Sequence, residues 1–347
     1  ASQIETVHSG DNVDSLVAII ARSGMVLFGA LTPPRLSILI FHRVHARADS
    51  IFPSEPDAVR FERLMRFVAR SFRVMALGEA VTCLANGNLP SRALVITFDD
   101  GYADNAEVAL PILQRCGLTA SFFVSTGFLD GGRMWNDSVI ECLRACRHSE
   151  IDLESFGLGR CSLADASDRR RVIEFLLPKI KYLSLVEREE AIARLKKLCG
   201  VTDIPNNLMM RSEQIREMHR AGMEIGAHTV RHPILTSLSA TEAKYEISEG
   251  RKQLQAIIDA PVDMFAYPNG KPDHDYNHSH VDLVRNLGFR GAVSTAPGVA
   301  RPSDDLFQLP RFTPWEHSLA IWGTRMLLNQ GHTRYPIATA DDTLLRK

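Results

Sequence analysis

Short apolar runs alternate with segments of helical periodicity along most of the chain. The apolar, β-rich runs are Ser37–Phe41, Phe72–Met75, Ala93–Phe98, Ala120–Val124, Met223–Ala227, Met264–Tyr267 and Gly291–Ser294. The helical patterns between them are Phe61–Arg70, Asn105–Cys116, Ser212–Ala221 and Ala240–Ile258. This alternation predicts an α/β fold in which crossover helices join the strands of a parallel sheet.

One stretch, from about residue 136 to residue 210, departs from this rhythm. It holds no run typical of a strand, but helical patterns cover Asp137–Cys146 and Asp168–Leu198. We therefore expect a helical insertion. Its polarity predicts that it lacks a core of its own large enough for a separate domain.

The first 36 residues contain an apolar stretch, Leu16–Leu31, that Arg22 and Ser23 interrupt. It is shorter than the ~20 residues that span a bilayer, so it predicts an amphipathic helix packed on the main domain or, alternatively, lying on a membrane surface. No signal-peptide pattern is visible, so secretion is not supported. We expect a cytoplasmic protein or one peripheral to the inner membrane face.

Charge and cysteine content narrow the functional classes. Forty Lys and Arg residues nearly balance 41 Asp and Glu residues, for a net charge of -1, which argues against nucleic acid as a partner. The six cysteines are scattered without a C-x-x-C pair, and we interpret them as reduced thiols. Nothing in the sequence indicates an oligomeric state.

Two adjacent carboxylates, Asp99 and Asp100, follow the apolar run Ala93–Phe98 directly. Burying such a pair is costly unless a metal ion or another cation compensates. Successive strand residues point in opposite directions, so the two carboxylates can share a site only if the strand has ended and Gly101 lets the chain turn. A turn or a helix N-cap is the alternative interpretation of Asp-Asp-Gly.

A histidine pair, His228 and His232, follows the run Met223–Ala227 in the same way. Histidines four residues apart on one helical turn present both imidazoles to one ion. In a β/α barrel the segments that follow the strands converge on one face, so the Asp and His pairs are expected to meet there.

Two more strand ends are expected on the same face. His42 follows Ser37–Phe41, and an acid or base role is the interpretation we favour because histidine titrates near neutral pH. Tyr267 ends the next-to-last apolar run, and Pro268, Asn269 and Gly270 after it offer an exposed backbone turn. Trp135 and Tyr267 are candidates for stacking on a ring of the substrate, with core packing as the alternative for both.

In these motifs, Thr-Phe-Asp-Asp-Gly together with His-x-x-x-His, the chain resembles the polysaccharide deacetylases that carry the nodulation-deacetylase (NodB) homology domain. The resemblance covers roughly Ser37 to Thr313 and implies a distorted parallel β/α barrel of seven or eight strands. We accordingly divide the chain into an N-terminal helical segment (1–36), a barrel domain (37–317) with the insertion, and a C-terminal tail (318–347).

The resemblance also implies roles for individual residues. Asp99 matches the family's general base, and Asp100, His228 and His232 match the ligands of one divalent metal ion. Zinc is the favoured ion, with cobalt, nickel or iron as alternatives. The run around His42 resembles that of the poly-N-acetylglucosamine deacetylases, in which the acid histidine comes from the first strand.

The chain departs from the commonest family pattern in two places. Ala266–Gly270 stands where the arginine that steadies the base is usual, and Arg311 is a candidate substitute. The usual late acid histidine is also not obvious, although His317 and His332 lie near the end.

The sequence thus predicts a metal-dependent hydrolase that removes N-acetyl groups from N-acetylhexosamine units of a polysaccharide, oligosaccharide or glycan precursor. Asp99 would deprotonate water, the backbone N–H of Asn269 would stabilise the oxyanion, and His42 would protonate the leaving amine. Alternatives are an O-deacetylase or another amide hydrolase on the same barrel, or a glycan-binding relative without activity.

Overall fold

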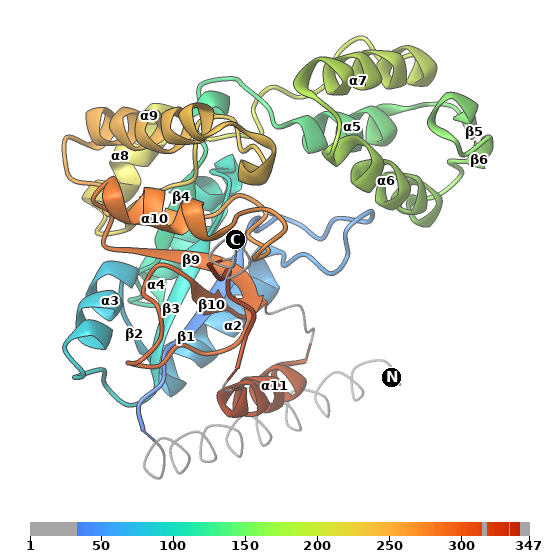
Figure 1. The fold of residues 1–347 in the computed structure, drawn as a ribbon. Coiled ribbons are helices and arrows are strands. Elements are labelled where there is room, and N and C mark those ends of the chain that lie inside the picture. Colours follow the sequence, from blue (N-terminus) through green and yellow to red (C-terminus); the bar gives the residue numbers. More distant parts are fainter. Residues whose placement is uncertain (1–32, 314–317, 333, 341–347) are drawn as a thin grey trace, which may run out of the picture.

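A computed structural model describes residues 33–313, 318–332 and 334–340 of the chain (Figure 1). The amphipathic helix expected before residue 33 lies outside these residues. Eight parallel strands form the main sheet: β1 (Ser37–Phe41), β2 (Arg73–Val74), β3 (Ala93–Phe98), β4 (Ser121–Val124), β7 (Glu224–Ala227), β8 (Met264–Ala266), β9 (Gly291–Pro297) and β10 (Leu309–Arg311). The strand β10 was missed by the sequence pattern.

The sheet curls into a nearly closed barrel. Its order is β1-β3-β4-β7-β8-β9-β10, with β2 beside β3. The first and last strands then meet, because the backbone N–H of Ile40 donates to the carbonyl of Phe312 at 3.0 Å and that of Phe312 donates to Ile38 at 2.7 Å. The expected α/β class with a distorted parallel barrel of seven or eight strands is confirmed.

Helices pack against the strands of the barrel. They are α2 (Ala58–Ser71), α3 (Leu77–Ala85), a π-helical turn (Asn105–Ala109) that continues into α4 (Leu110–Arg115), α8 (Ser212–Arg220), α9 (Ala240–Ile258), α10 (His278–Asn286) and α11 (Leu319–Gly331). Strand residues alternate between two apolar clusters. Leu39 and Ile96 pack with the outer helices, whereas Ile38 and Val95 pack with residues of α3.

The insertion forms its own layer, which Figure 1 shows projecting to one side of the barrel. It consists of α5 (Trp135–Ala145), the antiparallel strands β5 (Glu150–Asp152) and β6 (Arg160–Ser162), α6 (Ala166–Lys181) and α7 (Leu185–Cys199). The insertion has more of a core than its polarity predicted, because apolar residues of its three helices and of β5 form a buried cluster, to which Ile51 of the barrel domain also contributes. The hairpin was also not expected, since its strands are three residues long and polar.

The segment that follows the barrel begins with α11, whose Trp322 is 1% exposed and meets the rings of Phe67 and Phe72 edge-on. This contact holds α11 against α2. Among the described residues, none of the helices combines the length and the apolar character needed to cross a membrane.

Candidate metal centre

Asp99 and Asp100 lie where β3 has ended, as their position in the sequence requires. Asp100 has a φ of 78° and Gly101 a φ of 93°, so the chain turns sharply there. A Cβ atom at Gly101 would lie 2.9 Å from Cγ1 of Val124 on the neighbouring strand, which leaves room only for glycine. Both residues are buried, Asp99 at 2% and Asp100 at 6% exposure.

The two histidines come from the loop after β7 and not, as we expected, from a helical turn. Thr229 and His232 have φ values of 66° and 52°, which no right-handed helix contains. The loop is held from α9, because the backbone N–H groups of Val230 and Arg231 both donate to the carboxylate of Glu246. This geometry turns both imidazoles toward Asp100.

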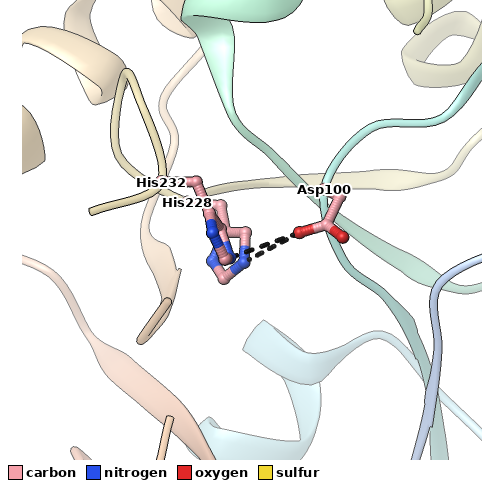
Figure 2. A group of neighbouring side chains, drawn as sticks. All are labelled: Asp100, His228 and His232. Atoms are coloured by element: carbon pink, nitrogen blue, oxygen red, sulfur yellow. Dashed lines mark ion pairs between the residues drawn. The ribbon is translucent and has the colours of Figure 1, made fainter. Parts of the chain in front are cut away.

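The side chains of Asp100, His228 and His232 converge in Figure 2. Oδ1 of Asp100 lies 3.4 Å from Nε2 of each histidine, and the three candidate ligand atoms are within 4.8 Å of one another. Nδ1 of His228 donates to the carbonyl of Ala266 at 2.7 Å, so that Nε2 keeps its lone pair. Oδ1 of Asp100 is buried without a hydrogen-bond partner. One carboxylate and two imidazoles therefore fit a divalent cation.

The electrostatics of these groups also suit a cation. Burial opposes ionisation of Asp100, but the two histidines outweigh it and hold the pKa of the carboxyl well below its usual range. Burial lowers the pKa of His232 to about 4, despite the opposing effect of Asp100, so this imidazole is neutral at pH 7. Burial also opposes protonation of His228, but the nearby carboxylates of Asp100 and Asp99 outweigh it and raise the pKa of this imidazole.

Asp99 is paired with Arg311, the residue suggested as a substitute for the family's usual arginine. Nη1 and Nη2 of Arg311 donate to Oδ1 and Oδ2 of Asp99, each at 2.7 Å, and Nε donates to the carbonyl of Ser294 at 2.8 Å. Both residues are at most 2% exposed. Burial opposes ionisation of Asp99, but the Arg311 charge outweighs it and lowers the pKa of the carboxyl.

We expect Arg311→Ala to lower the free energy of unfolding by about 3–5 kcal/mol at neutral pH, because it leaves a buried carboxylate without its countercharge. In the native protein the pKa of Asp99 lies below its ordinary value of 3.8. The pair with Arg311 therefore stabilises the fold at every pH above 3.8, and this stabilisation is lost as the pH falls through the lowered pKa. Arg311→Ala should therefore destabilise the fold less at acidic pH than at neutral pH, because a protonated Asp99 carries no charge that needs compensation. Urea unfolding at pH 5 and pH 8 measures both effects.

The matched control for this prediction is the double variant Asp99→Asn with Arg311→Met, which removes both charges. It should recover most of the lost stability, since an apolar replacement of a buried pair is often neutral. A double variant no more stable than Arg311→Ala would show that packing of the arginine, and not its charge, supports the fold.

A cavity of about 440 Å³ opens over these groups. His42 and Asn269 both line it beside the Asp and His residues, as expected. No described group accepts a hydrogen bond from the backbone N–H of Asn269. Trp135, a candidate from the sequence, also lines the cavity, and the insertion adds a wall that the sequence did not indicate: Asn136, Leu177, Pro178, Lys181 and Tyr182. Lys271 and Thr295 of the barrel also line the cavity.

Two of the candidate substrate residues are placed differently from expectation. Tyr267 is fully buried, its hydroxyl donates to the carbonyl of Phe307 at 3.0 Å, and its ring stacks on Tyr276 with centroids 3.9 Å apart. This ring is therefore core and is not accessible to a sugar. Pro268 is not among the residues lining the cavity, whereas Trp135 lines it.

Polar contacts fix the insertion to the barrel at the rim of this cavity. The hydroxyl of Tyr102, two residues after Asp100, donates to Oδ1 of Asp137 on α5 at 3.1 Å. Nζ of Lys181, at the end of α6, lies 3.8 Å from Oδ1 of Asp275 in the loop after β8. The wall formed by the insertion is thus tied to two strand-end loops.

Of the later histidines, His332 is exposed just after α11 and does not line the cavity. His317 lies outside the described residues.

Comparisons with solved structures agree with this fold. The chain is 19% identical to the Streptococcus pyogenes deacetylase PplD in complex with acetate, covering 86% of this chain and 99% of that one, with a TM-score of 0.55. It is 20% identical to IcaB from Ammonifex degensii (84% and 97% covered, TM-score 0.54). It is 17% identical to a de-N-acetylase from Aggregatibacter actinomycetemcomitans (80% and 94% covered, TM-score 0.50).

Sequence comparisons give the family. A Bacillus subtilis (strain 168) protein named "Putative polysaccharide deacetylase YxkH" is 20% identical over 281 residues, which are 80% of this chain and 71% of that protein. The family described as polysaccharide deacetylase matches residues 86–175 and 189–292, which together make up more than half of the chain. These matched segments include β3 with its Asp pair and the loop with both histidines, and the chain belongs to the polysaccharide deacetylase family.

Proposed function

We propose that the chain is a metal-dependent carbohydrate N-deacetylase that acts on N-acetylhexosamine units of a polysaccharide, an oligosaccharide or a glycan precursor. One observation carries the proposal. The Asp-His-His cluster lies beside a buried carboxylate, Asp99, that is paired with Arg311 and faces the same cavity. A site that only bound metal or glycan would have no use for this additional carboxylate.

Asp100, His228 and His232 would hold the ion. When bound, a divalent ion polarises the acetamide carbonyl and lowers the pKa of water. The protein residues supply the remaining steps. Asp99 accepts a proton as the water oxygen bonds to the carbonyl carbon, and Arg311 keeps this carboxylate ionised and oriented.

The backbone N–H of Asn269 donates to the oxygen that becomes negatively charged in the tetrahedral transition state. The C–N bond then breaks, and His42 gives its proton to the departing nitrogen, which leaves acetate and a free amine. His42 and Asn269 both line the cavity that contains Asp99. Two further points support an N-acetyl substrate: a fold neighbour is named a de-N-acetylase, and His42 comes from the first strand as in the subgroup acting on poly-N-acetylglucosamine.

Acetate release tests this function directly. We expect the zinc-loaded protein to release acetate from N-acetylglucosamine oligomers, and a chelator to stop the release because the open positions on the ion are needed for catalysis. Readdition of zinc, cobalt or nickel should restore it. An O-acetylated xylan oligomer is the matched comparison substrate. Faster acetate release from this ester would identify the protein as an O-deacetylase. No release from either substrate would favour a glycan-binding protein without activity.

A further inference from the structure

A second cavity of about 390 Å³ lies beside the candidate metal centre, and Trp135 lines both. We call it the basic pocket. Its charged lining consists of Arg133, Arg188, Lys196, Arg231 and one carboxylate, Glu189. Four cations against one anion are unusual in a chain whose net charge is -1.

The basic pocket is formed by the insertion and the metal-binding loop together. Arg188 and Lys196 lie eight residues apart on α7 and therefore share one helix face. Arg133 precedes α5, and Arg231 lies between His228 and His232 in the loop after β7. A ligand in this pocket would thus be next to the catalytic cavity.

Most of the positive charge in the basic pocket has no carboxylate partner. Arg231 pairs with Glu246 at 2.7 Å. Among the described residues, Arg133 donates to the hydroxyl of Ser138 and to two backbone carbonyls but to no carboxylate, and Lys196 has neither a hydrogen bond nor an ion pair. The local excess of charge is therefore available to a ligand.

Arg188 gives the strongest indication that the basic pocket binds an anion. Its Nη2 donates to the carbonyls of Lys181 and Leu183, and its guanidinium carbon lies 4.9 Å from the centre of the Trp135 ring. Its Nε is buried without a hydrogen-bond acceptor. Burial accordingly lowers the pKa of Arg188 with no opposing charge. Because Arg188 lines the pocket and has no carboxylate beside it, an anionic oxygen in the pocket would meet an uncompensated positive charge.

We propose that the basic pocket binds an anionic oxygen group, a phosphate or a carboxylate, carried by the same glycan whose acetamido group enters the metal centre. This inference rests on the proposed function and specifies its substrate class as acidic N-acetylated glycans. A volume of about 390 Å³ exceeds that of a single oxyanion and accommodates an acidic sugar unit or a sugar phosphate. Arginine donors match both kinds of oxyanion.

The test compares Lys196→Glu with the matched control Lys197→Glu, the next residue of α7, which is exposed and does not line the pocket. Three substrates are used with zinc-loaded protein: a neutral N-acetylglucosamine oligomer, an oligomer that alternates N-acetylglucosamine with glucuronic acid, and N-acetylglucosamine 1-phosphate. We expect Lys196→Glu to lower kcat/KM about tenfold or more for at least one acidic substrate, since charge-assisted hydrogen bonds are worth at least that factor. The neutral oligomer should be unaffected, and Lys197→Glu should behave like the unmodified protein.

Calorimetric binding of the same three compounds separates this inference from the proposed function, because it needs no turnover. Weakened binding of an acidic compound in Lys196→Glu supports the pocket even if no acetate is released, and the compound affected identifies phosphate or carboxylate as the group. Equal binding and turnover in the two variants would overturn the inference while leaving deacetylation intact. Lys196→Gln removes the positive charge without adding a negative one, so it should lower binding and turnover of the same acidic compound by a smaller factor. It replaces Lys196→Glu in the test if that variant does not fold.

Discussion

Replacing Asp100, His228 or His232 by alanine is expected to remove the metal ion and to lower kcat/KM by about 10³-fold or more. A bound ion supplies several kcal/mol of transition-state stabilisation, and each 1.36 kcal/mol corresponds to a factor of ten. The fold should persist, because all three residues lie on segments that follow strands and the substitutions leave their backbone hydrogen bonds to the neighbouring segment in place. Elemental analysis of the purified variants and melting temperature measure the two effects.

His274→Ala is the matched control for these ligand variants. His274 is an exposed histidine in the neighbouring loop after β8 and does not line the catalytic cavity. Its removal should leave metal content and turnover unchanged. Full occupancy in all three ligand variants would refute the assignment of the site, and retained activity without metal would refute the proposed chemistry.

The barrel was predictable because its strands are buried on both faces and therefore appear as continuous apolar runs. The runs Ser37–Phe41 and Ala93–Phe98 match β1 and β3 residue for residue. By contrast, β10 has three residues and contains Pro310, which removes a donor from the ladder and weakens any sequence signal. The core of the insertion was missed for another reason: its apolar side chains are contributed a few at a time by separate helices and the hairpin.

For the site, the rule that the carboxyl ends of parallel strands share one face was sufficient to bring the Asp and His pairs together. The backbone of the histidine loop could not be foreseen. Its left-handed residues depend on Glu246, fifteen or sixteen positions later, accepting two N–H groups of the loop. The wall formed by Lys181 and its neighbours likewise depends on how the insertion packs, which local patterns do not determine.

Asp99→Asn is expected to keep the metal and to lower kcat by about 10²- to 10⁴-fold, because a general base contributes proton transfer and not metal affinity. The neutral amide would also leave Arg311 without its countercharge, so turnover should be expressed per folded, metal-loaded molecule. Metal content by elemental analysis and acetate release from an N-acetylglucosamine oligomer measure the two quantities. Near-normal turnover with metal bound would exclude Asp99 as the base.

The pH profile adds a second measurement of the same role. Burial opposes ionisation of Asp99, but Arg311 lowers the pKa of this carboxyl below 3.8, so the base stays ionised at every higher pH. Titration of Asp99 should therefore cause no acid limb in kcat/KM between pH 5 and pH 8. In Arg311→Ala the charge that outweighs burial is gone, so the pKa of Asp99 should rise. An acid limb in kcat/KM should then appear between pH 5 and pH 8. If the profiles of the two proteins coincide on the acid side, Arg311 does not set the ionisation of the base, and its pairing with Asp99 serves the fold alone.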